Sequence, residues 1–306
     1  MTGPLAAFDR YWFRVMPAER LATIRILVGA YVVLYLLFGF DAVTDVGRFG
    51  AAHFAPAGLA KVLSGPLPPA LVVTLTIGTV LLGIPFIAGF RYRYVAPAFA
   101  LAFLWVTSYR NSWGMLFHTE NLLALHLVIL SAAPAADALA VDAGARAEPA
   151  GEASDYGWPV RAMTWVTVVC YVLAGIAKLK LAGPLWLGGD LLRAQIAYDN
   201  LRKLELGSNY SELGAWLVRH PAPFVALSWL TFALELGAPV ALLGRRAATA
   251  WVLAAWLFHV GVLVLMAIPF FYQLTLVAYA AFFPMERLSA AVQARVGRAS
   301  RVGSIQ

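Results

Sequence analysis

The sequence predicts an all-α protein, a polytopic bundle of transmembrane helices with about eight spans. The first observation is composition: the 306 residues are 61% hydrophobic and 13% charged, and the mean hydropathy is +0.75. A soluble domain is nearer to half apolar and a quarter charged. The second observation is that apolar runs recur at about the length of twenty residues that a helix needs to cross the hydrocarbon. The protein is therefore expected to be an integral membrane protein.

Eight apolar runs are expected to form the spans, and each is taken in chain order. They cover residues 21–40, 69–90, 94–110, 117–134, 161–180, 222–243, 247–267 and 269–284. The last two runs are nearly continuous and are separated by Pro269. At about 1.5 Å per residue their combined length exceeds one crossing, so the chain should fold back at this proline. The single cysteine, Cys170, lies in the fifth run and is expected to be a packing residue.

The basic residues predict the orientation of the bundle. An even number of spans puts both termini on one side, and that side carries the larger share of arginines near span ends, including Arg91, Arg93, Arg245 and Arg246. Basic residues mark cytoplasmic loops. We therefore expect a multi-pass protein of the inner (plasma) membrane with both termini in the cytoplasm. The arginines between and after the apolar runs account for the formal charge of +7, so no nucleic-acid partner is expected.

The domain organisation is expected to be a single transmembrane domain over residues 1–306. The stretch 135–160 is acidic and rich in Ala and Gly, which predicts a flexible cytoplasmic linker. Residues 285–306 form a basic tail, and no extramembrane domain is expected to follow the bundle. Residues 186–207 have leucines at helical spacing opposed by basic residues, with Asp190 suited to N-capping. This stretch predicts an amphipathic helix at the outer membrane surface, and a plain surface helix is the alternative.

Ionisable residues inside apolar runs are the candidates for function, because a charge there is costly unless it faces a partner or the bundle interior. They are Arg25, His118, Glu120, His126, Lys178, Lys180, Glu235 and His259. His126 is expected to be structural. The spacing of two between His118 and Glu120 differs from the three or four that helical metal ligands favour, so no metal site is predicted.

Lys178 and Lys180 lie at the end of the fifth run and differ in the faces they occupy. Two helical residues correspond to about 200° of rotation, so the two side chains point to opposite faces. Lys180 is nearer the end and can reach the headgroups, whereas Lys178 shares a face with Tyr171 and Gly175. A desolvated lysine can act as a neutral amine. Spacing alone favours boundary anchors for both lysines.

The expected topology brings several candidates to similar membrane depth. Lys178 lies in the outer half of the fifth span, and the fourth span starts at the outer face. That start contains His118, Glu120 and Asn121, with Asn121 on the face of His118. Glu235 and His259 are expected nearer mid-depth on the sixth and seventh spans. A histidine, a carboxylate and a lysine are thus predicted at one level.

Three segments resemble a known family: FHTENLLALHLVILSAAPAADALAVD, YVLAGIAKLKLAGPLWLGGDLLR and LFHVGVLVLMAIPFFYQLTLVAY. Over roughly residues 15–285 the chain resembles the membrane domain of vitamin K-dependent gamma-carboxylase and its bacterial relatives, the HTTM-domain proteins. In that family the AG-x-x-K-L segment, followed by W-x-x-G, carries the lysine that deprotonates the quinol. The resemblance places this role on Lys178, with Trp186 and Gly189 following.

The resemblance also implies a cofactor and further site residues. It implies a reduced quinone (vitamin K or menaquinol), with O2 and CO2 as co-substrates of a lyase-type carboxylation, and a peptide or protein acceptor in addition to membrane lipid. Lys178 would be the base, and His118 and Glu120 would orient it or stabilise the developing oxyanion. The residues expected to contact the cofactor are Asn121, Tyr171, Glu235 and His259.

Two other classes of function remain open from the sequence. The bundle could bind a quinone or lipid, or assist the maturation of a small peptide, without catalysis. Lys178 would then be a binding group or an anchor, and arginine could replace it. A transporter is less favoured, because paired broken helices and inverted repeats are not apparent.

Overall fold

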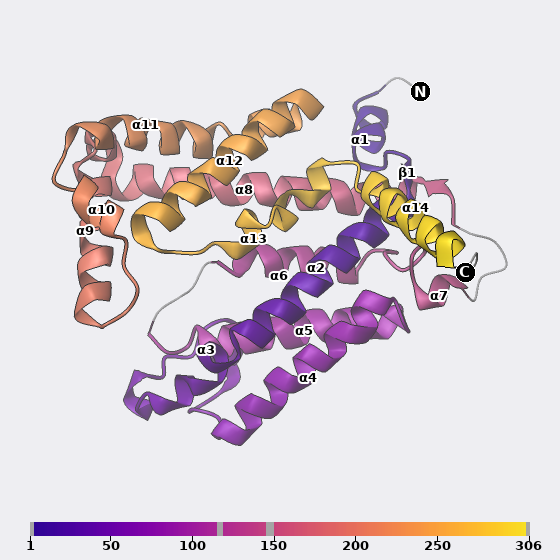
Figure 1. Cartoon of the computed structure of the whole chain (residues 1–306), viewed down its shortest axis with the longest axis horizontal. Helices are drawn as coiled ribbons and strands as arrows, with labels where there is room; N and C mark the ends of the chain where they lie inside the picture. The colour runs from indigo at the N-terminus through magenta and orange to yellow at the C-terminus, as the bar shows by residue number, and fades with distance from the viewer. Residues whose placement is uncertain (1–2, 115–118, 145–149, 304–306) are drawn as a thin grey trace. The chain divides into compact units, whose positions relative to one another are not determined.

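The structure is a computed structural model that describes residues 3–114, 119–144 and 150–303 (Figure 1). The chain forms two compact units, which are described separately. Unit 1 comprises Met1–Met163 and Phe283–Gln306, and unit 2 comprises Thr164–Phe282. The predicted all-α class is confirmed: among the described residues, two short strands, β1 (Met16–Pro17) and β2 (Glu152–Ala153), pair antiparallel and the other regular elements are helices.

Unit 1 is built around the helices that follow the N-terminal segment. Its α-helices are α1 (Pro4–Trp12), α2 (Ala18–Phe38), α3 (Phe40–Thr44), α4 (Pro69–Ala88), α5 (Tyr92–Arg110), α6 (Asn121–Ser131), α7 (Val141–Gly144) and α14 (Glu286–Gly303). Helix α4 packs against both α2 and α5. A Cβ added at Gly29 of α2 would lie 2.7 Å from Cδ1 of Phe86. Because small residues let apolar helices approach closely, Gly29 accounts for the close packing of α2 on α4.

Arg25 ties α2 to the chain that follows α6. Its side chain is fully buried, and its Nη1 donates to the carbonyl of Ala135 at 2.6 Å. Its Nη2 donates to the carbonyls of Leu139 at 2.6 Å and Ile87 at 3.2 Å. A buried guanidinium needs such acceptors, because an unpaired charge in an apolar interior is very costly. Arg25 therefore has a structural partner set made of backbone carbonyls.

Within the stretch 135–160, for which the composition predicts a flexible linker, residues 135–144 and 150–160 are described and make specific contacts. Ala135 is buried and its carbonyl binds Arg25, while the Asp142 carboxylate accepts from the backbone N–H of Arg91 and of Tyr92, both at 2.9 Å. Further on, β2 pairs with β1. In this stretch small residues leave the backbone carbonyls accessible, and the buried guanidinium of Arg25 uses those of Ala135 and Leu139.

Unit 2 consists of most of one long helix and the elements after it. Its elements are the last nineteen or so residues of α8 (Gly157–Ala182), η5 (Gly183–Gly188), α9 (Asp190–Glu205), α10 (Glu212–Leu217), α11 (Ala222–Leu236), η6 (Ala238–Leu242), α12 (Arg245–Met266), α13 (Phe271–Leu274) and η7 (Val277–Phe282). Helices α8 and α11 extend in similar directions, α12 runs obliquely to them, and α9 stands at a steep angle to α8 near its end (Figure 1).

Four described helical segments are long and apolar enough to cross a membrane: Ala18–Phe38, Pro69–Ala88, Ser154–Gly188 and Arg245–Met266. Two shorter apolar helices are α6 and α11. The expected last span at 269–284 is not a single helix, and α13 and η7 take its place. The break starts at Ala267, which has a φ of 50° two residues before Pro269, and Leu276 has a φ of 64°. Tyr272, Tyr279, Ala278, Ala280 and Ala281 are buried, whereas Phe271 and Leu276 are exposed, so part of the apolar side chains of this stretch packs inside unit 2.

The predicted amphipathic helix is α9, and its exposed face differs from the simple expectation. Gly189, and not Asp190, is the N-cap residue. Asp199 and Asn200 are buried, whereas Tyr198 and Leu201 are exposed. The Asn200 amide donates to the carbonyl of Leu265 at 2.9 Å, at the end of α12. The polar face of α9 is therefore the one that binds the protein.

Candidate functional site

Lys178, in the last turns of α8, pairs with Glu235 of α11. Its Nζ donates to Oε1 of Glu235, and the two side chains are 21% and 4% exposed. Lys180 is exposed, so the structure separates the two lysines as helical geometry predicts. Desolvation makes a buried ion pair costly unless the charges stay together. The pair therefore links α8 to α11 and places a titratable amine inside unit 2.

Gly175 brings α11 close enough for this pair to form. A Cβ added there would lie 2.7 Å from Cδ2 of Leu236 and 3.2 Å from Cβ of Glu235. The predicted close approach along the face of Tyr171, Gly175 and Lys178 is present at the glycine. Gly175 is one turn before Lys178, so the absence of a side chain there positions the carboxylate beside the amine.

Two aromatic rings and two polar atoms complete the surroundings of Lys178. Its Nζ lies 5.0 Å from the ring centroid of Trp186 and 6.0 Å from that of Phe258, within the range of cation–π attraction. Nε1 of Trp186 and Oε2 of Glu235 are buried without a hydrogen-bond partner among the described residues. Buried polar atoms normally have partners. One donor and one acceptor thus remain for a polar ligand next to the amine.

A second polar cluster in unit 2 is centred on Tyr171. Its hydroxyl lies 2.7 Å from Nε2 of His259 and 2.5 Å from the hydroxyl of Tyr279. All three side chains are buried, and the ring of Trp251 stands edge-on to Tyr171 with a centroid distance of 4.9 Å. Hydrogen-bonded chains of this kind hold side chains in one arrangement. The cluster fixes α8, α12 and η7 together, two turns from Lys178 along α8.

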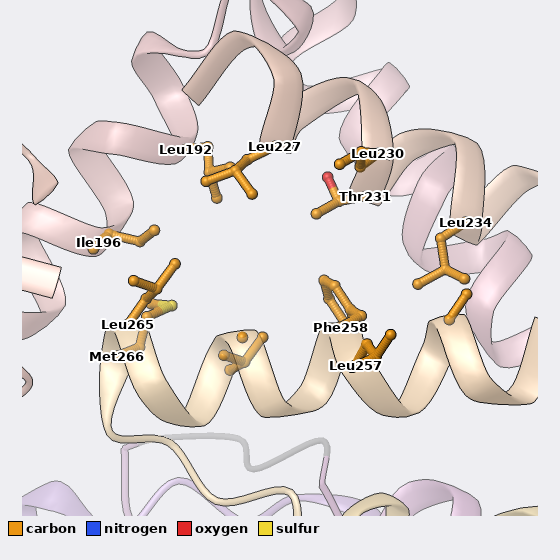
Figure 2. A pocket seen from close by; sticks show the side chains of 13 residues that line it. Leu192, Ile196, Leu227, Leu230, Thr231, Leu234, Leu257, Phe258, Leu265 and Met266 are labelled. Atoms are coloured by element: carbon orange, nitrogen blue, oxygen red, sulfur yellow. The ribbon is translucent and has the colours of Figure 1, made fainter. Parts of the chain in front are cut away.

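An apolar pocket of about 360 Å³ lies among α9, α11 and α12 (Figure 2). Leu192, Leu234 and Leu265 are among its lining residues, and Thr231 contributes a hydroxyl. Phe258 also lines it, and this ring is the one within 6.0 Å of Lys178 Nζ. Pockets that are mostly apolar with a few polar groups are typical of small-molecule sites. Phe258 therefore stands between an apolar cavity and the Lys178–Glu235 pair.

The candidates of unit 1 have a different environment. Arg110 donates to Oε1 of Glu120 at 2.7 Å, and the hydroxyl of Tyr35 donates to the same oxygen. Asn121 is exposed at the first turn of α6. His118 lies outside the described residues. We predicted that Lys178, His118 and Glu120 lie at the same membrane depth. Glu120 belongs to unit 1 and Lys178 to unit 2, so this stays a prediction.

Several neighbours of the candidates were missed by the sequence reasoning. Tyr279 was assigned to an expected span, so its approach to Tyr171 had no sequence signal. Arg110 and Tyr35 surround Glu120, and only the position of Arg110 at a span end hinted at a partner. His126 is buried and its Nε2 lies 3.3 Å from the carbonyl of Met163, as suits a structural histidine. Within the described part of the chain, no three His, Cys, Asp or Glu side chains gather as metal ligands would.

The fold and the site define a helical membrane protein with a buried lysine–glutamate pair beside an apolar pocket. The model of the HTTM domain family matches residues 13–286 of this chain. The chain therefore belongs to the HTTM domain family. Searches of curated proteins and of solved structures give no significant match.

Proposed function

We propose that this protein is a quinol-dependent membrane enzyme in which Lys178 accepts a proton from a reduced quinone. The observation that carries the proposal is the Lys178–Glu235 pair next to Phe258, whose ring also lines the apolar pocket. The resemblance to gamma-carboxylase supplies the reaction class, and membership of the HTTM domain family is consistent with it. The proposed reaction is quinol oxygenation to an epoxide, coupled to carboxylation or another modification of a peptide acceptor.

The apolar lining of the pocket supports a quinone as the proposed ligand. A quinone with an isoprenoid chain has a long apolar part, and the pocket walls are leucine, isoleucine, valine, methionine and phenylalanine side chains. Its polar ring oxygens would need partners at one end. Oε2 of Glu235 and Nε1 of Trp186 are buried without partners among the described residues and both belong to groups that contact Lys178. They would hold a hydroxyl of the quinol.

Lys178 and Glu235 would move the proton together. A lysine accepts a proton only as the neutral amine, so the proton that Nζ shares with Glu235 must first pass to the carboxylate. Carboxylate and amine are in direct contact, so this transfer needs no intervening group. Glu235 would then be the positioning residue and Lys178 the catalytic base. The aromatic walls from Trp186 and Phe258 would keep water from the pair.

The bound quinol, with O2, would supply the strong base for the acceptor. One oxygen atom would enter the epoxide and the other would leave as water, and the acceptor carbanion would add CO2. His118 and Glu120 would assist by orienting groups or stabilising an oxyanion, as the resemblance implies. Tyr171 and His259, joined by a hydrogen bond, would support the cofactor end of the site.

A non-enzymatic binding protein is the second candidate. The observation that favours it is that Lys178 is ion-paired and so already serves as a clamp between α8 and α11. In that case the protein would bind a quinone or lipid, or assist peptide maturation. Charge alone would then suffice at position 178. The two candidates differ in whether the residue must release and accept a proton.

The test of the enzymatic proposal is turnover by the purified protein. Menaquinol or vitamin K hydroquinone, O2 and labelled CO2 are supplied, and quinone epoxide and label incorporation are measured. The wild type should form epoxide, and Lys178→Arg should not, because arginine does not deprotonate in proteins. Epoxide formation by Lys178→Arg would contradict a role as base. Quinone binding without epoxide in the wild type would support the binding protein instead.

The pocket is tested separately by filling it. A Cβ added at Gly261 of α12 meets no atom within 4 Å, so Gly261→Leu should place its side chain in the pocket without displacing the helix. Binding of menaquinone, measured by quenching of intrinsic tryptophan fluorescence, should weaken at least tenfold. The matched control is Ala250→Leu, which puts the same side chain at an exposed position of α12. Equal binding by both variants would exclude this pocket.

The proposed setting is the inner membrane with both termini in the cytoplasm. Its support is the distribution of arginines along the sequence. Reporter fusions at each terminus test it: a cytoplasm-dependent reporter such as a fluorescent protein should be active at both ends. Activity of a reporter that needs the opposite compartment at either end would contradict the proposed topology.

A further inference from the structure

Helix α14 has an outward surface made of arginines and aliphatic residues. Arg287, Leu288, Val292 and Arg295 are all exposed, with Leu288 and Val292 at 46% and 54%. These aliphatic residues are four apart and share a side of the helix, next to the side with the arginines. Glu286, Ser289 and Gln293, by contrast, face a groove of unit 1. The helix thus binds the protein with one side and leaves a basic, amphipathic side uncovered.

The start of α14 is fixed to the end of a candidate membrane span. Both oxygens of Glu286 accept from Arg20, Nε to Oε2 and Nη2 to Oε1, each at 2.7 Å. Arg20 lies in the first turn of α2, the span Ala18–Phe38. From there α14 crosses the start of α2 and does not continue along it (Figure 1). The helix therefore starts beside the first turn of this candidate span.

The charge of α14 favours an anionic surface. Its sequence contains Arg287, Arg295, Arg298 and Arg301, and its single acidic residue, Glu286, is already paired with Arg20. Helix α1 lies in the same unit and also exposes apolar side chains, with Leu5 at 80% and Phe8 at 56%. Basic helices with an exposed aliphatic stripe bind in the interface of membranes that contain anionic lipids.

We propose that α14 is a lipid-binding helix that lies on the bilayer face next to the start of α2 and binds anionic phospholipid headgroups. The arginines bind the phosphates, and Leu288 and Val292 enter the boundary with the acyl chains. This contact is independent of the quinol chemistry proposed for unit 2. It would hold the ends of α2 and α14 at a fixed depth and make the position of unit 1 depend on lipid charge.

The experiment uses the full-length protein in liposomes with an environment-sensitive fluorophore on one cysteine. Because Cys170 is the single native cysteine, Cys170→Ser gives a clean background, and Val292→Cys carries the label. In liposomes with phosphatidylglycerol the label should shift to the blue and be quenched by lipid-attached quenchers. In pure phosphatidylcholine it should behave as in water. Ala290→Cys, on the side that faces the groove, is the matched control.

Removing the arginines should abolish the contact. Each is expected to contribute about fivefold to the bound population, so changing all four to Gln should return the Val292→Cys signal to its phosphatidylcholine value. High salt should act in the same direction. Equal signals in the two lipids, or an unchanged signal in the four-Gln variant, would overturn the proposal. A gel-filtration profile like that of the wild type confirms that the four changes leave the fold intact.

Discussion

Two buried carboxylates, one in each unit, differ in the cation that accompanies them. Glu120 accepts from Arg110 and Tyr35, and Glu235 accepts from Lys178. In both, Oε2 is buried without a hydrogen-bond partner among the described residues. The side chains of Arg110 and Lys178 are similarly covered, at 15% and 21% exposed. The geometry is thus alike while the chemistry is not.

The difference shows that burial and ion pairing do not by themselves mark a reactive site. A guanidinium stays protonated, so the Arg110–Glu120 pair cannot pass a proton to the carboxylate. An ammonium can pass a proton to a carboxylate. Lys178 also lies near the ring of Phe258, which lines the apolar pocket. We therefore infer that the pair in unit 1 serves mainly to stabilise that unit. The pair in unit 2 is the one suited to proton transfer.

The largest expected effect is on turnover in variants of the two cations. Lys178→Arg should lower quinol-dependent epoxidation by about 10²–10⁴-fold, the usual contribution of a general base. Arg110→Lys should lower it by less than tenfold, because it keeps a cation beside Glu120. Initial rates of epoxide formation measure both. Equal losses in the two variants would remove the distinction between the pairs.

The next effect concerns the stability of the two carboxylate variants. Glu120→Gln should destabilise by about 3–5 kcal/mol, since it leaves Arg110 charged and buried. Glu235→Gln should cost about 1–2 kcal/mol, because the Lys178 side chain is flexible and already 21% exposed and its amine can reach water. Thermal unfolding of the purified protein in detergent gives both values. The double change Arg110→Met with Glu120→Leu should recover most of the loss, and a larger loss for Glu235→Gln would contradict the comparison.

A smaller effect is expected from the glycine that positions Glu235. Gly175→Ala should cost about 1–3 kcal/mol and reduce turnover about tenfold, because the methyl group would push Leu236 and Glu235 away from α8. Gly78→Ala, in α4 of unit 1, is the control, since a Cβ there meets nothing within 4 Å. It should be neutral or stabilise by up to about 1 kcal/mol. A neutral Gly175→Ala would show that the close approach does not position the pair.

The smallest effect is the pH dependence of the Arg20–Glu286 bond. Burial raises the pKa of Glu286, but the bonds and charge of Arg20 outweigh it and hold the pKa below its ordinary value. Because the pKa of Glu286 is lowered in the folded protein, the stabilisation from the Arg20–Glu286 bond is complete at neutral pH. It decreases below the ordinary glutamate pKa of about 4.3 and is lost as pH falls through the value in the folded state.

The effect of this bond is limited to about 1 kcal/mol because the pair is near the surface. Hydrogen exchange of α14 between pH 3 and 7 should show the helix loosening at the acid end once intrinsic exchange is corrected. Glu286→Gln should remove the pH dependence while leaving a weaker contact with Arg20. A pH-dependent profile that persists in Glu286→Gln would assign the change to another group.

The sequence predicted the helical membrane class and separated Lys178 from Lys180. Composition and the length of the apolar runs determine the class, because a helix satisfies its own backbone in lipid. Helical periodicity placed Lys178, Gly175 and Tyr171 on one side, and the structure has Gly175 at the close approach. The run at 269–284 is not the single helix that its hydropathy predicts, because hydropathy does not show where the backbone breaks.

Only the tertiary structure decided which partner each charged residue has. Lys178 and Glu235 are 57 residues apart, and Tyr171 and Tyr279 are 108 residues apart, so no local pattern joins them. The same holds for Arg25. Its partners are backbone carbonyls, which every residue has, so the sequence does not show which of them Arg25 binds. Sequence periodicity fixes the side of a helix that a residue occupies. The neighbour on that side depends on how distant helices pack, because side-chain contacts form only where their surfaces meet.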